Sequence, residues 1–305
     1  MKVSVVIPAK NESASLPMLL GGLKKLDQVE EIIVVNDGST DETSNICQEF
    51  GVIEVKHPYS KGNGAAIKSG TRASSGDILL FMDADGQHRP EDIPALLDKM
   101  SNGYDMVVGA RHSSSQAGIG RLVANGFYNK FASWMVDQKI EDLTSGFRVV
   151  KAEKFKRFLY LLPNGFSYPT TSTMAFFRAG FSVGYLPFKA QKRVGKSHIN
   201  YIKDGVRFLL IIFKVGSLYS PLKLFTPISV GFFILGLIRY VVTYAESSSF
   251  TNMSALLFVS AVIVFLIGIV SEQITMLMYQ RTEGAEQREE VSIQRGEAGV
   301  DGLGQ

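Results

Sequence analysis

The sequence predicts an α/β domain with a mainly parallel sheet, followed by a helix at a membrane surface and a hairpin of two membrane-spanning helices. Over the first 110 residues, short apolar runs alternate with helical patterns, and the runs are apolar throughout rather than at every second residue. Strands of that kind are typical of a parallel sheet covered on both faces. Between residues 225 and 279, two apolar segments are each long enough to cross a bilayer.

Composition and charge narrow the class of protein. The chain has 305 residues, which exceeds one average domain, and a mean hydropathy of +0.11 with 46% hydrophobic residues. A formal net charge of +3 is small for this length, so we expect no nucleic-acid partner. The single cysteine excludes an intrachain disulfide framework and a four-cysteine zinc site. The four histidines are scattered without metal-ligand spacing.

Each apolar run that we expect to form a strand is followed by turn or helix-capping residues. We expect Pro8 to end the first strand, and beyond residue 119 the alternation becomes irregular. The expected strands are 3–7, 32–35, 52–55, 78–82, 105–108 and 183–188. The expected helices are 14–26, one ending at residue 50, 65–73, 90–100, 121–136 and one within 166–178.

Two acids directly follow the fourth of these runs. Asp83 and Asp85 come after the strand, with Gly86 to turn the chain and Gln87 beside them. Acids at positions i and i+2 past a strand end can converge on a hard cation such as Mg²⁺ or Mn²⁺, which would hold a phosphate or diphosphate. Aspartate and glycine are also ordinary turn residues, so a solvated turn is the alternative.

Polar residues at the ends of the other strands favour the ligand site. They gather at the carboxyl edge of the predicted sheet, where open α/β sheets bind nucleotides. A dinucleotide fingerprint is excluded because residue 67, the third small position of the run 62–67, is isoleucine, and a P-loop because residues 195–197 lack the leading glycine. The polar strand ends are Asn11, Glu12, Asp37, Lys61, Asp83, Asp85 and Arg111.

A basic loop closes the domain between residues 189 and 198. Cations in a flexible loop suit a diphosphate or a lipid phosphate, and a solvated surface loop is the alternative. Its polar residues are Lys189, Lys192, Arg193, Lys196, Ser197 and His198.

The last third of the chain is predicted to associate with a membrane. Residues 206–219 carry an apolar stripe with basic edges, which suits a helix in the bilayer interface, although a buried core helix is the alternative. The predicted spans are 225–244 and 255–279, and the segment between them has no lysine or arginine. The positive-inside rule therefore places both termini in the cytoplasm. No secretory signal precedes the first strand, so a catalytic part, if the chain has one, is also expected to be cytoplasmic.

These patterns divide the chain into four segments. The expected segments are a catalytic domain over 1–200, an amphipathic juxtamembrane helix over 201–222, the two spans within 223–280, and a disordered cytoplasmic tail over 281–305. Small residues on the spans could pack against another copy of the hairpin, which would make a homo-oligomer. They are Gly231, Gly236 and Gly268.

Several motifs, taken in order, resemble those of family 2 glycosyltransferases, in particular the polyprenyl-phosphate sugar synthases. The resemblance covers about residues 1 to 215 by motif and the whole chain by layout, and it implies a GT-A nucleotide-sugar domain. The motifs are Pro8-Ala9-Lys10-Asn11-Glu12, Val34-Val35-Asn36-Asp37-Gly38-Ser39, Gly62-Asn63-Gly64-Ala65, Asp83-Ala84-Asp85-Gly86-Gln87 and Gly146-Phe147-Arg148.

The resemblance also implies roles for individual residues. It implies that Pro8, Ala9, Asn11 and Glu12 line the nucleotide pocket, that Asp37 contacts the base or ribose, and that Asp83 contacts the nucleotide or sugar. Asp85 and Gln87 would bind the metal, and Arg111 and Arg121 would face the donor and acceptor phosphates. Arg193 and Ser197 would close over the diphosphate. The catalytic residues would be Asp85, Arg111 and Arg121. Gly86 stands where many relatives have leucine, so the local turn is expected to differ.

The activity implied by the resemblance is the inverting transfer of one hexose from a nucleotide-diphosphate sugar, of the UDP-glucose or GDP-mannose class, to a polyprenyl phosphate. Mg²⁺ or Mn²⁺ would be the cofactor. Chain polymerisation is disfavoured because the only tryptophan, Trp134, follows Ser133 and so lacks the Gln-x-x-Arg-Trp motif of processive synthases. Two alternatives are an inactive sugar-nucleotide-binding membrane scaffold and a transferase to a lipid without a phosphate.

Overall fold

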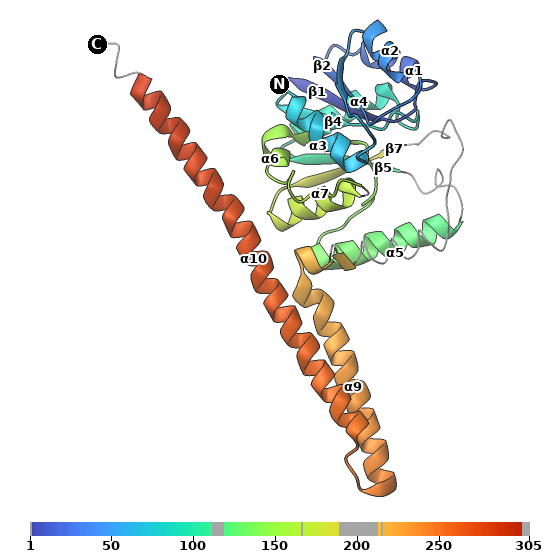
Figure 1. Ribbon diagram of the computed structural model, residues 1–305, viewed down its shortest axis with the longest axis vertical. Helices are drawn as coiled ribbons and strands as arrows, with labels where there is room; N and C mark the ends of the chain where they lie inside the picture. The colour runs from blue at the N-terminus through green and yellow to red at the C-terminus, as the bar shows by residue number, and fades with distance from the viewer. Residues whose placement is uncertain (1, 112–118, 166, 189–212, 215, 301–305) are drawn as a thin grey trace. The chain divides into compact units, whose positions relative to one another are not determined.

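The computed structural model describes residues 2–111, 119–165, 167–188, 213–214 and 216–300, with 119–125 and 279–300 described by their backbone alone. The chain forms two compact units, Met1–Ile211 and Ile212–Gln305, which are described separately below (Figure 1). Most of the predicted helix over 201–222 and the basic loop 189–198 lie outside the described residues.

The first unit is built on a seven-stranded sheet in the order β3-β2-β1-β4-β6-β5-β7. The predicted mainly parallel sheet is confirmed, with one exception: β6 runs antiparallel between β4 and β5. The strands are β1 (Val3–Ala9), β2 (Glu31–Asn36), β3 (Ile53–Lys56), β4 (Ile78–Phe81), β5 (Met106–Arg111), β6 (Arg148–Lys151) and β7 (Val183–Phe188).

The first strand is longer than the sequence predicts. Pro8 does not end β1, because the register with β2 continues through Pro8↔Val35 to Ala9↔Asn36. Proline lacks only the backbone N–H, and the next carbonyl, that of Ala9, accepts a hydrogen bond from Asp37 N at 2.8 Å. The carboxyl end of β1 therefore lies level with the end of β2.

Helices cover both faces of the sheet (Figure 1). On one face, α1 and α4 bury leucine and isoleucine side chains against Val5, Ile7 and Leu80. On the other, Gly70 of α3 packs on Val6 and Val35 with no room for a larger residue. The helices are α1 (Leu16–Leu23), α2 (Thr43–Glu49), α3 (Asn63–Ala73), the 3-10 turn η1 (Pro90–Asp92), α4 (Ile93–Ser101), α5 (Ile119–Val136), α6 (Ala152–Lys156) and α7 (Tyr168–Arg178).

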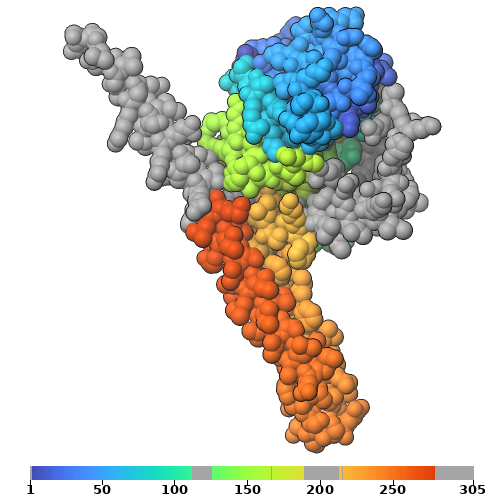
Figure 2. Space-filling model, viewed as in Figure 1, coloured from blue at the N-terminus to red at the C-terminus, as the bar shows by residue number. Residues whose placement is uncertain are grey.

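The second unit is a hairpin of α9 (Pro221–Ser247) and α10 (Asn252–Val300). Residues 221–247 and 252–278 are long and apolar enough to cross a membrane. The two helices lie side by side (Figure 2), and Ser229 Oγ of α9 donates a hydrogen bond to the Ala261 carbonyl of α10 at 2.8 Å. The predicted hairpin is confirmed.

Two details of the hairpin differ from expectation. The backbone of α10 remains helical to Val300, whereas its polarity predicts disorder from residue 281; the glutamate, glutamine and arginine residues of this stretch are strong helix formers. Of the glycines expected to pack against another copy, Gly236 packs on Leu257 and Phe258, and Gly268 on Phe225, all within the hairpin. Among the described residues, Gly231 alone of the three has no neighbour within 4 Å of an added Cβ atom.

Candidate functional site

The two acids predicted to bind the metal and the donor lie directly after β4, at the carboxyl end of that strand. Two hydrogen bonds close the turn: Asp83 N donates to His88 Nδ1 at 3.2 Å, and Gln87 N donates to Asp85 Oδ1 at 3.1 Å. Gly86 has a φ of 75°, in the left-handed region that glycine adopts most readily. Glycine in place of leucine therefore suits the turn that carries both acids.

His88 holds this acidic turn, although it is absent from the residues predicted for the site. Its ring stacks on Phe147, with centroids 4.9 Å apart and planes 13° apart. Burial lowers the pKa of His88 to about 4, and the charge of Asp85 only partly opposes this shift. The imidazole is therefore neutral at pH 7, with Nδ1 as the acceptor for Asp83 N. Its position directly after Gln87 was the one sequence signal that could have found it.

Asp37 anchors a loop rather than presenting a free carboxylate. Its Oδ1 lies 2.7 Å from His57 Nδ1 and 2.8 Å from Lys61 N, and its Oδ2 lies 2.7 Å from Ser60 Oγ and 2.9 Å from Gly62 N. Burial raises the pKa of Asp37, but these hydrogen bonds outweigh it and lower the pKa to about 2. Protein donors therefore already meet both oxygens, and the expected contact with a base or ribose stays a prediction.

Asn11 joins the loops that follow β1 and β2. It adopts a φ of 55°, and its Oδ1 accepts a hydrogen bond from Thr40 N at 2.8 Å while its own N–H donates to Ser39 Oγ at 3.0 Å. Its neighbour Glu12 accepts a hydrogen bond from Ser15 Oγ at 3.0 Å. The predicted pocket residues Pro8, Ala9, Asn11 and Glu12 thus lie together at the carboxyl end of β1.

The amino terminus of α3 is closed by another part of the chain. Ala65 N donates to the Asn164 carbonyl at 2.8 Å. A Cβ atom on Gly64 would lie 2.0 Å from the Pro163 carbonyl oxygen, and one on Gly62 would lie 2.6 Å from that of Asn164. These glycines therefore admit protein carbonyls, not phosphate, which agrees with the absence of a phosphate-binding fingerprint at this helix.

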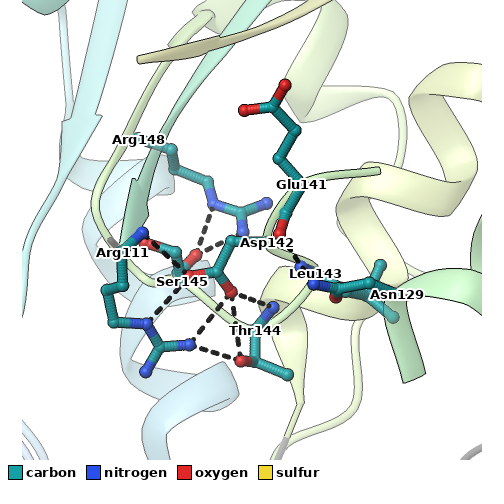
Figure 3. Close-up of polar contacts among 8 residues, drawn as sticks. All are labelled: Arg111, Asn129, Glu141, Asp142, Leu143, Thr144, Ser145 and Arg148. Atoms are coloured by element: carbon teal, nitrogen blue, oxygen red, sulfur yellow. Dashed lines mark hydrogen bonds and ion pairs between the residues drawn. The ribbon is translucent and has the colours of Figure 1, made fainter. Parts of the chain in front are cut away.

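Arg111, at the carboxyl end of β5, forms a two-pronged ion pair with Asp142 (Figure 3). Its Nε lies 2.8 Å from Oδ2 and its Nη2 lies 2.9 Å from Oδ1, and Nη2 also donates to Thr144 Oγ1. Burial lowers the pKa of Arg111, but the Asp142 carboxylate outweighs it and the pKa rises. The guanidinium is therefore held as a fixed positive charge beside the acidic turn, whose Asp83 also acts on it electrostatically.

Three predicted site residues cannot be placed by their side chains. Arg121 lies in the first turn of α5, where the structure describes the backbone only. Arg193 and Ser197 lie outside the described residues. Their expected contacts with phosphates stay predictions.

The structure adds Asp142, Arg148 and Tyr168, to which the sequence assigned no role. Asp142 follows no strand and sits in the loop that enters β6, so its pairing with Arg111 depends on the antiparallel return of β6 beside β5. Arg148 and Tyr168 are fully buried next to the same loop. The one sequence signal was the motif Gly146-Phe147-Arg148, which marks the segment but not its contacts.

These features define a class of protein: a GT-A-like α/β domain with polar groups at the carboxyl edge of its sheet, joined to an apolar helical hairpin. Residues 4–159 match the family described as glycosyl transferase family 2, and residues 220–277 match the GtrB C-terminal hairpin. The chain belongs to glycosyl transferase family 2, and the expectation of a glycosyltransferase is confirmed at the level of the family.

Named relatives share parts of the chain. It is 37% identical over 153 residues to an undecaprenyl-phosphate 4-deoxy-4-formamido-L-arabinose transferase from Proteus mirabilis, covering 47% of this chain and 44% of that protein. It is 30% identical over 206 residues to a polyprenol monophosphomannose synthase from Mycolicibacterium smegmatis, covering 62% of this chain and 77% of that protein. The chain thus matches less than half of the Proteus relative and about three quarters of the mycobacterial one.

Solved structures share the fold. Glucosyl-3-phosphoglycerate synthase from Mycobacterium tuberculosis, crystallised with Mn²⁺ and UDP-glucose, superposes with a TM-score of 0.58 at 22% identity, covering 71% of this chain and 78% of that chain. The same enzyme crystallised with Mn²⁺, UDP and phosphoglyceric acid gives a TM-score of 0.59. These likenesses confirm the GT-A-like fold of the first unit.

Proposed function

We propose that the protein transfers one hexose, with inversion, from a nucleotide-diphosphate sugar of the UDP-glucose or GDP-mannose class to a polyprenyl phosphate. The observation that carries this proposal is the sheet edge where the acidic turn lies between the Asn11 loop and the Arg111–Asp142 pair. The relatives named above act on undecaprenyl phosphate or polyprenol phosphate by their names, and this supports a lipid phosphate as the acceptor.

The residues of the acidic turn fit Mg²⁺ or Mn²⁺. Asp85 and Gln87 would supply carboxylate and amide oxygens, which these cations prefer. Within the described ranges, no three or more His, Cys, Asp or Glu side chains come together as a complete metal site. Mg²⁺ is commonly held by one or two carboxylates plus substrate phosphates, so this limited set suits a cation shared with a diphosphate. When bound, the cation would neutralise charge on the leaving diphosphate.

The chain's own cations would stabilise the same leaving group and the acceptor. Asp142 and Thr144 fix Arg111 before any ligand arrives, so little reorganisation is needed when charge develops during transfer. In this proposal Arg111 and Arg121 face the donor and acceptor phosphates, and Arg193 and Ser197 close over the diphosphate. Asp83, beside Arg111, would contact the sugar or nucleotide.

A phosphate acceptor reduces the need for a general base. A phosphate monoester has a second pKa of about 6, so its oxygen is already anionic at neutral pH. A lipid that offers only a hydroxyl would need a base to remove its proton. His88 is a poor candidate for that base, because its Nδ1 already accepts the Asp83 N–H and its ring is buried.

The membrane would bring the acceptor to the site. The hairpin has the length and apolar character to anchor the chain, and both termini would lie in the cytoplasm. In the first unit, α5 exposes Phe127 and Trp134, whose rings flank Phe131 at helical spacing. Aromatic side chains of this kind favour the bilayer interface. Confinement to the same surface would raise the local concentration of a lipid acceptor.

The test is a transfer assay with the full chain in detergent or lipid nanodiscs. Radiolabelled UDP-glucose, GDP-mannose and related donors are each mixed with Mn²⁺ and undecaprenyl phosphate, and label is extracted into organic solvent. We expect one donor to give a labelled lipid. Nucleotide-sugar binding without transfer would support the scaffold instead, and no labelled lipid with any donor would contradict the proposal.

A further inference from the structure

Arg148 is a fully buried cation with no carboxylate partner among the residues that the structure describes. Its guanidinium donates to the Ser145 carbonyl from Nε at 3.2 Å and again from Nη2 (Figure 3). Its Nη1 donates to the Pro169 carbonyl at 3.0 Å, Ser172 Oγ at 2.9 Å and Thr173 Oγ1 at 3.0 Å. Burying an arginine costs free energy unless its donors are satisfied, and here neutral oxygens from two segments satisfy them.

These bonds tie the segment Ser145–Phe147 to α7. Arg148 reaches across from Ser145 to the first two turns of α7, and its guanidinium lies 5.7 Å from the ring centre of Tyr168. Tyr168, at the start of α7, donates its phenolic O–H to the Gly146 carbonyl at 3.0 Å. Two successive carbonyls, those of Ser145 and Gly146, are therefore each fixed by a buried side chain.

The fixed segment lies against the acidic turn at two points. A Cβ atom on Gly146 would be 2.9 Å from Asp83 Oδ2 and 3.4 Å from the Tyr168 hydroxyl, so glycine leaves room for the carboxylate where any side chain would displace it. One residue further, Phe147 stacks on His88, which accepts the hydrogen bond from Asp83 N. The segment thus lies close to the Asp83 carboxylate and, through the His88 ring, to the Asp83 backbone.

Charge supports the same arrangement. Asp142 is already bonded at both oxygens to Arg111. Burial lowers the pKa of Arg148, while the charges of Asp142 and Asp83 act in the opposite direction. The positive charge of Arg148 therefore lies within electrostatic reach of the donor-facing acid without bonding to it.

We propose that Arg148 and Tyr168 are positioning residues, which hold Ser145–Phe147 against the acidic turn and so place the Asp83 carboxylate for the donor. The effect on transfer rests on the function proposed above. The placement of the acidic turn does not rest on that function, and it can be measured without any transfer assay. Neither residue touches the substrate in this proposal.

The most selective test is Gly146→Ala, because its methyl group would meet the Asp83 carboxylate. Gly126→Ala is the matched control, since a Cβ atom at Gly126 meets no described residue within 4 Å. We expect Gly146→Ala to lower kcat/KM for the donor about 100-fold, as misplacement by about 1 Å can do, with little change in the KM for the lipid. Gly126→Ala should behave as the wild type. Equal donor kinetics for the two variants would overturn the proposal.

Tyr168→Phe and Arg148→Lys test the two side chains themselves. Tyr168→Phe removes one hydroxyl and keeps the ring, so we expect a roughly 5-fold loss in donor kcat/KM, the size of one ordinary hydrogen bond. Arg148→Lys keeps the charge but loses the paired donors that span Ser145 and α7, and we expect a larger loss. Unchanged kinetics, or a change confined to the KM for the lipid, would contradict the proposed role.

Amide hydrogen exchange separates this proposal from the function proposed above. In the full chain without substrates, Gly146→Ala and Tyr168→Phe should speed exchange in the peptide spanning 82–90 at least several-fold, while exchange in the β2 peptide stays unchanged. This readout does not depend on any sugar transfer. If the wild type shows no sugar transfer but the variants exchange faster, the positioning role is supported and the proposed transferase function is contradicted. If the wild type transfers sugar but the variants exchange at the wild-type rate, the function is supported and the positioning role is contradicted.

Discussion

Replacing Asp37 by asparagine tests whether this residue anchors a loop or binds the donor. The carboxylate accepts hydrogen bonds at both oxygens, and each oxygen receives one backbone N–H, from Lys61 or from Gly62. Ser60 and His57 could each reverse their role as donor, but a backbone N–H cannot. In either orientation of the asparagine amide, its NH₂ group therefore faces one backbone N–H.

The expected cost follows from that clash. Leaving a buried donor unsatisfied costs about 1–3 kcal/mol, and the lost charge weakens the remaining hydrogen bonds further, so we expect roughly 3 kcal/mol. For a domain of about 200 residues, each kcal/mol shifts Tm by about 2–4 °C, which predicts a fall of about 6–12 °C. Asp27→Asn, the same change at an exposed aspartate, should shift Tm by less than about 2 °C.

The pH dependence of the Tm difference between wild type and Asp37→Asn provides an independent check. The pKa of Asp37 is about 2 in the folded protein and 3.8 unfolded, so its charge stabilises the fold above pH 3.8. This contribution of the Asp37 charge to the free energy of unfolding, roughly 2 kcal/mol by linkage, is lost as the pH falls from about 4 to about 2. The Tm gap between wild type and Asp37→Asn, followed by circular dichroism, should therefore narrow over that range. A variant with unchanged Tm that fails to bind UDP with Mn²⁺ would refute the loop-anchor role.

Three further changes probe other parts of the site. Gly64→Ala should destabilise the fold by several kcal/mol, since its Cβ atom would lie 2.0 Å from the Pro163 carbonyl oxygen, and a Tm within 2 °C of wild type would contradict this. Arg111→Lys cannot reproduce the two-pronged pairing with Asp142, so we expect kcat to fall about 100-fold in the transfer assay; a fall below 3-fold would argue against a fixed charge. Ser145 Oγ is buried and has no hydrogen-bond partner in the described part of the chain, so Ser145→Ala should leave Tm unchanged or raise it by a few degrees. A clear fall in the urea concentration at the midpoint of unfolding would contradict that.

The strands and the acidic turn could be predicted because their signals are local. Runs of four to six residues predicted every parallel strand, and the turn after β4 is contiguous in the sequence. The antiparallel return of β6 could not be predicted, because the run Val149–Val150 is short and carries no information on direction. The partners of Arg111 and Asp83 depend on that return, so Asp142 and Gly146 received no role from the sequence.

The loop contacts of Asp37 could not be predicted, for a different physical reason. An aspartate at the end of a parallel strand can reach a ligand or bond to backbone N–H groups of a neighbouring loop, and the same sequence motif suits both. Which one occurs depends on where the loop after β3 runs, and here it folds back so that Lys61 and Gly62 point their N–H groups at the carboxylate. His88 was missed because a lone histidine gives no sign of the ring beneath it, Phe147.

Acceptor chemistry is the most direct test of the proposed transfer. The 305-residue chain, Mn²⁺ and the donor identified by the labelled panel are mixed with undecaprenyl phosphate or with undecaprenol, and both labelled lipid and released nucleoside diphosphate are measured. Transfer should occur to the phosphate alone, with one nucleoside diphosphate released for each labelled lipid, and Asp85→Ala should abolish it while Tm stays within a few degrees. Equal labelling of the alcohol, or unimpaired turnover by Asp85→Ala, would contradict the proposed reaction.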